Sequence, residues 1–339
     1  MLLVLDNFEH LLDFPSADMA TGVITALLAS APHIKVLVTS RAPLHLSSEH
    51  IYEVPSLTPA AARDLFVSRA TALSPAFKPR PYDEQAIAGI CKRLDYLPLA
   101  IELAAARIRL FEPPALLKRL AAPLDFLTGG PKDLPQRQRT LRNAIGWSYQ
   151  LLAPEEQTVF RRLSIFADGC TMTMIEAIAD RDLTSPVVDI VQSLVDKSLL
   201  KTERVNGTIR FSLLEMLREY ASELLANTPE AETIAKRSAQ WFVDQVYSMQ
   251  STPAIGDSAI WFDWFDLEKN NLRAIIQWSL HSNHVEYGLQ LAANLGMTWR
   301  MYGPMRDGWQ LVSQLLKHPN VHDYIHLYGQ TLQIGRAHV

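Results

Sequence analysis

The chain has 339 residues, of which 48% are hydrophobic and 20% charged, with 20 Pro against 14 Gly. This composition excludes disordered, collagen-like and membrane proteins and fits a globular chain of two or three domains, at roughly 150 residues each. The 32 Lys and Arg against 36 Asp and Glu give a net charge of -4, so the chain as a whole lacks the basic excess of a nucleic-acid binder. The net charge does not exclude a local basic patch.

The cysteines and the apolar runs of the sequence indicate the cellular compartment. Cys91 and Cys170 are the two cysteines of the chain, too few for a disulfide framework or a cysteine-rich metal site, and they fit a reducing cytoplasm. The richest apolar stretch, Leu97–Leu110, is broken by charged residues and falls short of the ~20 residues that a membrane helix needs. We therefore expect a cytoplasmic protein with no membrane partner.

The first 40 residues predict a strand, a helix and a second strand. Met1–Leu5 is an apolar run that ends in Asp6, residues 16–31 have helical spacing, and a second apolar run at 34–38 ends in Thr39–Arg41. A right-handed crossover makes such strands parallel and brings Asp6 and Thr39–Arg41 to the same carboxyl edge, where ligands bind. A buried parallel strand needs neighbours on both sides, so we expect at least one more strand upstream of Met1.

Helices dominate the next segment. A short strand is expected at 51–54, and Thr58-Pro59 then signals a helix start. Four amphipathic helices follow, at 59–73, 83–94, 98–110 and 113–121. They predict a small helical bundle, which a Pro- and Gly-containing linker at 123–136 separates from the rest.

The following segment predicts a winged helix. The expected helices lie at 137–152, 154–166, 171–179 and 186–197, with another at 214–225. Between them, Asn206-Gly207 joins two runs of strand type, at 199–205 and 208–213, which is the strongest short signal for a hairpin.

The remainder is helical and rich in Trp. The spacing at 272–281 and 285–302 indicates paired antiparallel helices of the kind that stack in repeat arrays. Because about three repeats are needed for a continuous core, we expect the array to continue beyond this chain. The last six residues, Ile334–Val339, match the translation of a widely used sequencing adaptor, and we interpret them as an artefact outside the fold.

Two side chains at the expected sheet edge suit nucleotide chemistry. Asp6 can hold Mg²⁺ through water beside a phosphate, although an Asp that caps the next turn would look the same. Arg41 suits contact with a terminal phosphate, although an Arg at a strand end is also common on solvated surface.

Three segments together resemble motifs of the signal-transduction ATPases called STAND or NB-ARC proteins: Leu2–Leu11, Val36–Arg41 and Leu97–Ala105. More narrowly, the chain is similar to the bacterial ATPases that form the middle of large LuxR-type and related transcriptional regulators. Further matches to that subgroup lie at Arg139–Leu141, Trp147–Tyr149, Leu163–Phe166, Leu194–Leu199, Leu214-Glu215 with Arg218–Ala221, and Asn271–Ala274 with Trp278.

The resemblance implies a fold and a domain order. Residues 1–56 would be the C-terminal half of an α/β P-loop NTPase core, 57–135 a helical bundle with a GLPL-type motif and a linker, and 136–228 a winged helix. Residues 229–333 would begin a TPR-like helical repeat array, ahead of the suspected artefact at 334–339.

The resemblance also implies site residues. Asp6 would be the Walker B acid on Mg²⁺ through water, Thr39, Ser40 and Arg41 would form sensor 1, and Leu97 with Pro98 would be the GLPL-type motif that packs near adenine.

The chain departs from the family pattern at several places. Asp95-Tyr96 stand where the glycine of the GLPL-type motif is often found, and Leu214-Glu215 stand where plant and animal relatives carry a His-Asp pair. Asn7 stands where many relatives have a second acid, and an amide cannot act as a general base; Glu9 could orient water, or could simply face the dipole of the next helix. We therefore expect slow ATP hydrolysis. No Walker A motif occurs in the sequence. We expect it upstream of Met1, and we expect this chain alone to bind ATP poorly and to be inactive.

Three functions follow from these observations. The leading one is part of an ATP/ADP-dependent switch that uses Mg²⁺. In this function an unknown inducer or protein acts on the helical repeats, and DNA is bound only through an output domain outside this chain. Whether the protein forms oligomers on activation is left open. The second is a DNA-binding winged-helix transcription factor, favoured by Lys132, Arg137, Arg139 and Arg142 and opposed by the acids of helix 186–197. The third is an interaction scaffold without hydrolysis, which Asn7 permits.

Overall fold

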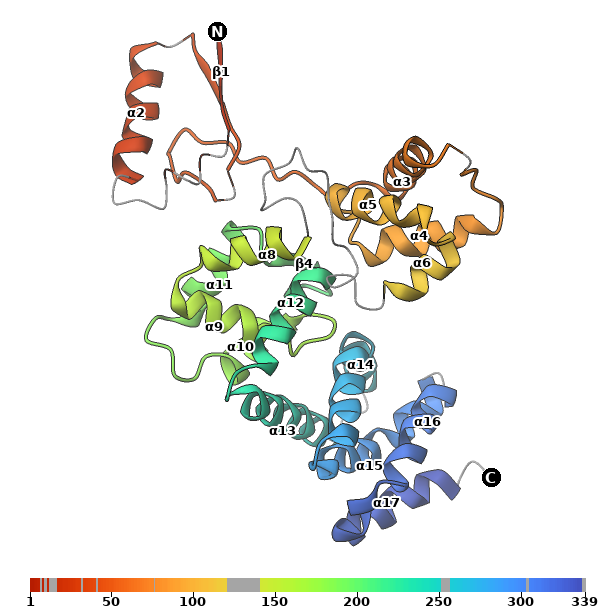
Figure 1. Ribbon diagram of the computed structural model, residues 1–339. Coiled ribbons are helices and arrows are strands. Elements are labelled where there is room, and N and C mark those ends of the chain that lie inside the picture. The colour runs from red at the N-terminus through yellow and green to blue at the C-terminus, as the bar shows by residue number, and fades with distance from the viewer. Residues whose placement is uncertain are drawn as a thin grey trace. The chain divides into compact units, whose positions relative to one another are not determined.

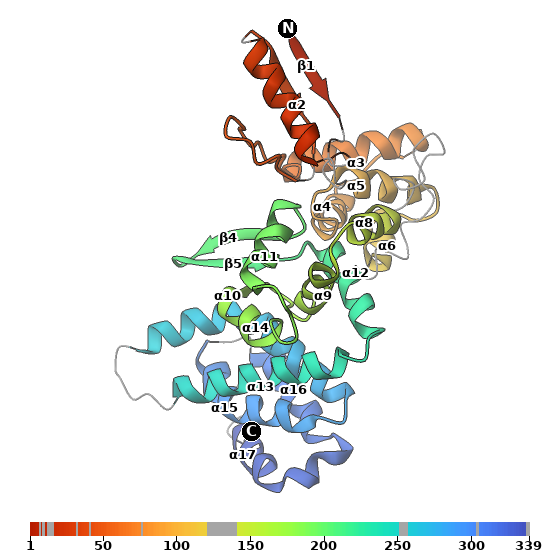
Figure 2. The same ribbon diagram turned by 90° about the vertical axis from the view of Figure 1, so that its left-hand side faces the viewer.

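The structure is a computed structural model that describes residues 1–6, 8, 11, 17–31, 33–40, 42–75, 77–120, 141–250, 257–302 and 305–336. It divides into two compact units, drawn in Figures 1 and 2 and described here one at a time. Unit 1 comprises Met1–Arg161, Leu183–Glu203 and Leu213–Glu223, and unit 2 comprises Arg162–Asp182, Arg204–Ser212 and Leu224–Val339. In the described ranges, no helix is both long and apolar enough to cross a membrane.

The N-terminal part of unit 1 has the predicted strand, helix and strand. Strand β1 (Leu2–Leu5) pairs in parallel with β2 (Lys35–Val38), and helix α2 (Ala17–Ser30) connects them. The register pairs Leu2 with Lys35 and Leu5 with Val38, which confirms the parallel arrangement.

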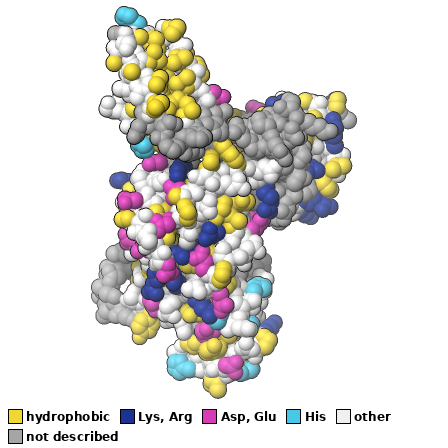
Figure 3. All heavy atoms as spheres, turned by 60° about the vertical axis from the view of Figure 1, so that its left-hand side comes forward, with side chains coloured by type: hydrophobic (Ala, Val, Ile, Leu, Met, Phe, Trp, Pro, Cys, Tyr) yellow, Lys and Arg dark blue, Asp and Glu magenta, His cyan; other side chains and the backbone are white. Residues whose placement is uncertain are grey.

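Alternate residues of this sheet differ in burial. Leu3, Leu5, Val36 and Val38 are partly buried on one face. On the other face Leu2, Val4 and Leu37 are exposed by 60%, 56% and 54%. Figure 3 shows hydrophobic side chains gathered in its upper part, where β1 and α2 lie in Figures 1 and 2. The strand expected at 51–54 does not form: these residues pair with none of the described strands, and Ile51, Tyr52 and Val54 are exposed.

The predicted helical bundle is confirmed in its element order. It consists of α3 (Pro59–Leu73), α4 (Asp83–Arg93), α5 (Pro98–Ala105), η1 (Ala106–Arg109) and α6 (Pro113–Arg119). Helix α3 starts as expected, because the Thr58 side chain accepts a hydrogen bond from the Ala61 N–H at 3.3 Å and Pro59 occupies the first turn. The third helix is shorter than predicted and continues as the 3₁₀ turn η1. Fully buried side chains form the core: Phe66, Ile87, Ile90, Ile101 and Leu116.

The next elements have the order of a winged helix. They are α8 (Leu141–Gln150), α9 (Pro154–Leu163), β3 (Cys170–Thr171), α10 (Met172–Ile178), α11 (Val187–Asp196), β4 (Lys201–Val205), β5 (Thr208–Ser212) and α12 (Glu215–Ala226). Asn206 and Gly207 both have positive φ, +49° and +81°, as a type I′ hairpin turn requires. The hairpin, visible in Figure 2, is therefore confirmed, and we call it the wing.

Strand β3 was not expected from the sequence. It adds to the wing in the order β3-β5-β4, with Cys170 opposite Phe211 and Thr171 opposite Arg210. Two residues are too few to produce a strand signal, because alternation cannot be recognised over so short a run.

Long helices make up the rest of unit 2. They are α13 (Ala231–Gln250), α14 (Asp257–His281), α15 (Val285–Tyr302), α16 (Met305–Leu316), η3 (Pro319–Tyr324) and α17 (Ile325–Arg336). Helix α15 packs against α13, α14, α16 and α17. A Cβ on Gly288 of α15 would lie 2.2 Å from Ser279 Oγ and 2.7 Å from Leu315 Cδ2, so this close packing of α15 on α14 and α16 depends on a glycine.

Two expectations concern this region. The expected helix pair at 272–281 and 285–302 is confirmed, although α14 begins earlier, at Asp257. Helix α17 runs as far as Arg336, and the interpretation of 334–339 as an adaptor-derived artefact stays a prediction. Residues 337–339 lie outside the described residues, as do the linker at 123–136 and the expected helix start at 137–140.

Candidate functional site

The carboxyl edge of the β1-β2 sheet brings two of the predicted site residues together. Asp6 follows β1 directly and Thr39 follows β2, and the Thr39 hydroxyl donates a hydrogen bond to Asp6 Oδ1. The backbone supports this pair, because Thr39 N–H donates to the Leu5 carbonyl at 2.9 Å and Phe8 N–H donates to the Thr39 carbonyl at 2.9 Å. The parallel arrangement that the sequence predicted therefore brings Asp6 beside Thr39.

Other predicted residues of this edge are only partly described. Ser40 is half-buried, and its hydroxyl oxygen accepts from Ala42 N–H at 3.3 Å, which shapes the turn after β2. Asn7, Glu9 and Arg41 lie outside the described residues, so their roles in positioning water and in sensing phosphate stay predictions.

The chemistry of this edge fits a magnesium nucleotide in part. Asp6 is exposed and lies next to a hydroxyl, as suits a hard cation that keeps several of its waters. No cluster of three His, Cys, Asp or Glu side chains occurs within the described ranges.

The second predicted nucleotide element starts helix α5. Leu97 is the N-cap of α5 and Pro98 its first residue, which confirms the helix start expected at Pro98. The backbone hydrogen bonds of Leu97 are local, from its N–H to the Leu94 carbonyl at 3.0 Å and from Ile101 N–H to its own carbonyl at 3.0 Å. Contact of Leu97 and Pro98 with adenine stays a prediction.

The two residues before this motif adopt an uncommon backbone. Asp95 and Tyr96 have φ of +52° and +56°, in the left-handed region that favours glycine. The turn is held by hydrogen bonds from Tyr96 N–H to the Cys91 carbonyl at 3.0 Å and from Leu57 N–H to the Tyr96 carbonyl at 3.1 Å. Both residues therefore adopt the left-handed conformation although neither is a glycine.

Asp95 also faces the start of helix α12, which sequence reasoning missed. Burial raises the pKa of the Asp95 carboxyl, and the backbone N–H groups of Met216 and Glu215, together with the charge of Lys201, oppose that shift only in part. Its Oδ2 is buried with no hydrogen-bond partner among the described residues, and Arg93 lies 4.0 Å from Glu215. The turn at Asp95 and Tyr96 therefore lies beside the N-terminus of α12.

Helix α11, which precedes the wing in the sequence, carries acidic and neutral side chains. Helix α11 contains two acids, Asp189 and Asp196, and no Lys or Arg. The Lys197 ammonium that follows lies 2.7 Å from both carboxylate oxygens of Glu156, so it neutralises a buried acid. A helix that reads the major groove normally offers basic and amide side chains to base edges and phosphates, and α11 offers Gln192 alone among these types.

Comparison with known proteins identifies the domain around α11. A family model described as a winged helix-turn-helix domain matches residues 152–226. That range holds α9, α10, α11, the wing and α12, so the winged helix predicted from the hairpin signal is confirmed.

Longer similarity extends over most of the chain. It is 37% identical over 325 residues to a protein of Mycobacterium tuberculosis H37Rv named "Putative HTH-type transcriptional regulator", covering 95% of this chain and 36% of that protein. A Mycobacterium bovis protein of the same description matches equally. A second M. tuberculosis H37Rv protein, which is uncharacterised, is 34% identical over 241 residues, covering 70% of this chain and 60% of its own length.

One solved structure is similar at a low level. It is a crystal structure of a signal transduction ATPase with numerous domains (STAND) from Pyrococcus horikoshii that carries a tetratricopeptide repeat sensor, with a TM-score of 0.37, 16% identity, and coverage of 98% of this chain and 42% of that one. A similarity of this size does not establish a common fold. This chain contains a winged helix-turn-helix domain, and it spans about a third, 36%, of the length of the mycobacterial regulators that it resembles.

Proposed function

We propose that this chain is the switch region of a longer bacterial transcriptional regulator, in which ATP or ADP with Mg²⁺ controls the position of the winged helix-turn-helix domain. The regulator part rests on the winged domain and on the similarity to the mycobacterial proteins over 95% of this chain. The nucleotide part rests on one observation, the contact between Asp6 and Thr39 at the carboxyl edge of two parallel strands.

The residues have separate roles in this proposal. Asp6 would hold Mg²⁺ through water, with Thr39 fixing its carboxylate, while Ser40 and Arg41 would face the terminal phosphate. Leu97 and Pro98 would pack near adenine. The turn at Asp95 and Tyr96 lies beside the start of α12, so a nucleotide near Pro98 would be close to the winged domain.

Binding tests the nucleotide part. In a chain extended to include a phosphate-binding loop, calorimetry should show binding of Mg-ADP or Mg-ATP that Asp6→Asn weakens about tenfold or more, because the metal loses its carboxylate. The matched control is Asp64→Asn, at an exposed acid of the helical bundle, which should bind as the wild type does. The 339-residue chain alone should bind ATP poorly, and equal binding by wild type and Asp6→Asn would contradict the proposal.

A second function, direct DNA binding by the winged domain, is favoured by the family match at 152–226. The composition of α11 opposes it, since its two acids would face the phosphates of a groove. Duplex DNA titrated into the chain at two salt concentrations separates these functions. We expect weak binding, whereas tight binding that falls steeply with salt would make the winged domain a DNA reader.

A further inference from the structure

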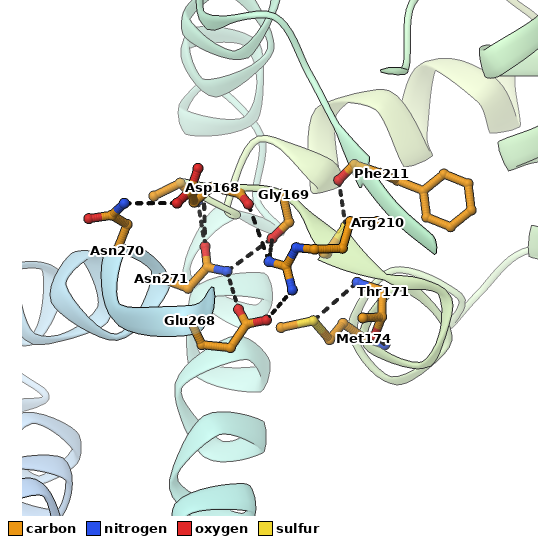
Figure 4. Close-up of polar contacts among 11 residues, drawn as sticks. Asp168, Gly169, Thr171, Met174, Arg210, Phe211, Glu268, Asn270 and Asn271 are labelled. Atoms are coloured by element: carbon orange, nitrogen blue, oxygen red, sulfur yellow. Dashed lines mark hydrogen bonds and ion pairs between the residues drawn. The ribbon is translucent and has the colours of Figure 1, made fainter. Parts of the chain in front are cut away.

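A pair of buried charges joins the wing to the helical region. Arg210 lies on β5 and Glu268 on α14, 58 positions apart, and the Arg210 guanidinium Nη1 donates to Glu268 Oε1. Their side chains are only 9% and 2% exposed. Both residues belong to unit 2, and Figure 4 shows them pointing toward each other from the two elements.

The same guanidinium contacts a third segment. Arg210 Nη2 donates to the carbonyl oxygens of Asp168 and Gly169, at 3.2 and 3.1 Å, in the turn that leads into β3. Because the guanidinium is planar and rigid, these bonds and the ion pair fix one another's geometry. Arg210 therefore ties together β5, the turn at 168–169 and α14.

Asn271, one turn after Glu268, completes the arrangement. Its Oδ1 accepts from the backbone N–H of Ala167 at 2.7 Å and of Asp168 at 3.3 Å. Its Nδ2 donates to the Gly169 carbonyl at 3.0 Å and to Glu268 Oε2 at 2.6 Å. All the donors and acceptors of this amide face the turn or Glu268 (Figure 4), so its orientation is determined by its partners.

A buried network of this kind resists separation of its parts. Removing one partner leaves a charge without compensation in a medium of low dielectric constant, and such losses are large compared with those of surface pairs. The network also occupies the guanidinium of Arg210, which is thereby directed inward to α14.

We propose that Arg210, Glu268 and Asn271 form a joint that fixes the wing of the winged domain to helix α14, so that the wing and the helical region move as one body. A change in α14 caused by a ligand on the helices would reach the wing through these three side chains. That relay rests on the proposed switch function, whereas the joint itself does not depend on nucleotide.

Hydrogen exchange of the full chain, followed by mass spectrometry, tests the joint. Glu268→Gln keeps the shape of the side chain but leaves Arg210 without a counter-charge and places an amide where Asn271 now donates. We expect exchange to rise about tenfold or more on both sides, in the wing with residues 167–171 and in the middle of α14, while the α3–α6 bundle is unchanged. The matched control is Asp266→Asn on the same helix, because Asp266 pairs with Lys269 in an exposed contact at 2.7 Å.

The outcome distinguishes a joint from a local contact. A rise in exchange on one side alone, or on neither side, would overturn the proposal. If Glu268→Gln does not fold, Asn271→Ala is read in the same way, since it keeps the ion pair and removes only the amide bridge. A failure of nucleotide binding would leave this result unaffected, so the joint and the proposed function can fail separately.

Discussion

Gly169 shows at the scale of one residue how closely the wing and its neighbouring turn approach. Its φ is +76°, and a Cβ there would lie 2.7 Å from the Phe211 carbonyl oxygen and 3.1 Å from Ser212 Cβ. Its carbonyl oxygen also accepts hydrogen bonds from Arg210 and Asn271. The position therefore requires a residue without a side chain. It also requires that the peptide plane after Gly169 keep its orientation.

Gly169→Ala is expected to lower the free energy of unfolding by about 2 kcal/mol or more, from the strained φ and the clash with backbone atoms. Urea unfolding followed by circular dichroism measures this change. Gly22→Ala, in α2 with no atom within 4 Å of the added Cβ, should be neutral or stabilising by up to about 1 kcal/mol. Equal effects of the two changes would show that the close approach at Gly169 is absent.

The buried carboxyl of Asp95 leads to a prediction about how stability depends on pH. Because burial raises the pKa of its carboxyl, its contribution to stability is fully present below the unfolded pKa of about 3.9 and is lost as the pH rises through the higher folded value. Asp95→Asn should therefore unfold at a higher temperature than wild type at pH 7, with the difference shrinking toward pH 4. Asn also tolerates the positive φ at this position.

Thermal unfolding at several pH values measures this difference. The control, Asp64→Asn, changes an exposed acid that pairs with Arg63 and should show no comparable gain at pH 7. An Asp95→Asn variant that is less stable than wild type at pH 7 would mean that the charged carboxylate holds α12 in place.

At the scale of elements, short strands limit what the sequence can reveal. The hairpin at Asn206-Gly207 and the starts of α3 and α5 were predictable, because turn and capping residues report local geometry directly. Strand β3 and the contact of Asp95 with α12 were not, since both depend on residues distant in sequence. The unpaired Ile51–Val54 shows the opposite error, because β-branched and aromatic residues favour extended backbone without supplying a partner strand.

On one face of the β1-β2 sheet, the apolar side chains of Leu2, Val4 and Leu37 are more than half exposed. Such faces promote association. Leu37→Lys should reduce self-association of the chain, measured by size-exclusion chromatography with light scattering at increasing concentration. Ile325→Lys changes a side chain that is 75% exposed at the start of α17 and should leave association as it was. If both variants associate like the wild type, this face does not drive association.

At the scale of the whole molecule, the parts divide the proposed function among them. The sheet edge at Asp6 and Thr39 would bind nucleotide, the turn at Asp95 would lie between nucleotide and α12, and the network at Arg210 would connect the wing with α14. The sequence predicted the first of these from two strand ends. The network at Arg210 could not be predicted, because nothing in the sequence distinguishes Arg210, Glu268 and Asn271 from other polar residues of a strand and a helix.

The most direct test of nucleotide switching is hydrogen exchange of the extended regulator, saturated in turn with Mg-ADP and with Mg-ATP. We predict that exchange at residues 94–98 and at the start of α12 differs between the two states, because nucleotide at the Asp6 edge would change the contact of the Asp95 turn with α12. In Asp6→Asn the difference should disappear. Identical exchange in the two saturated states at both segments would contradict a nucleotide-controlled winged domain.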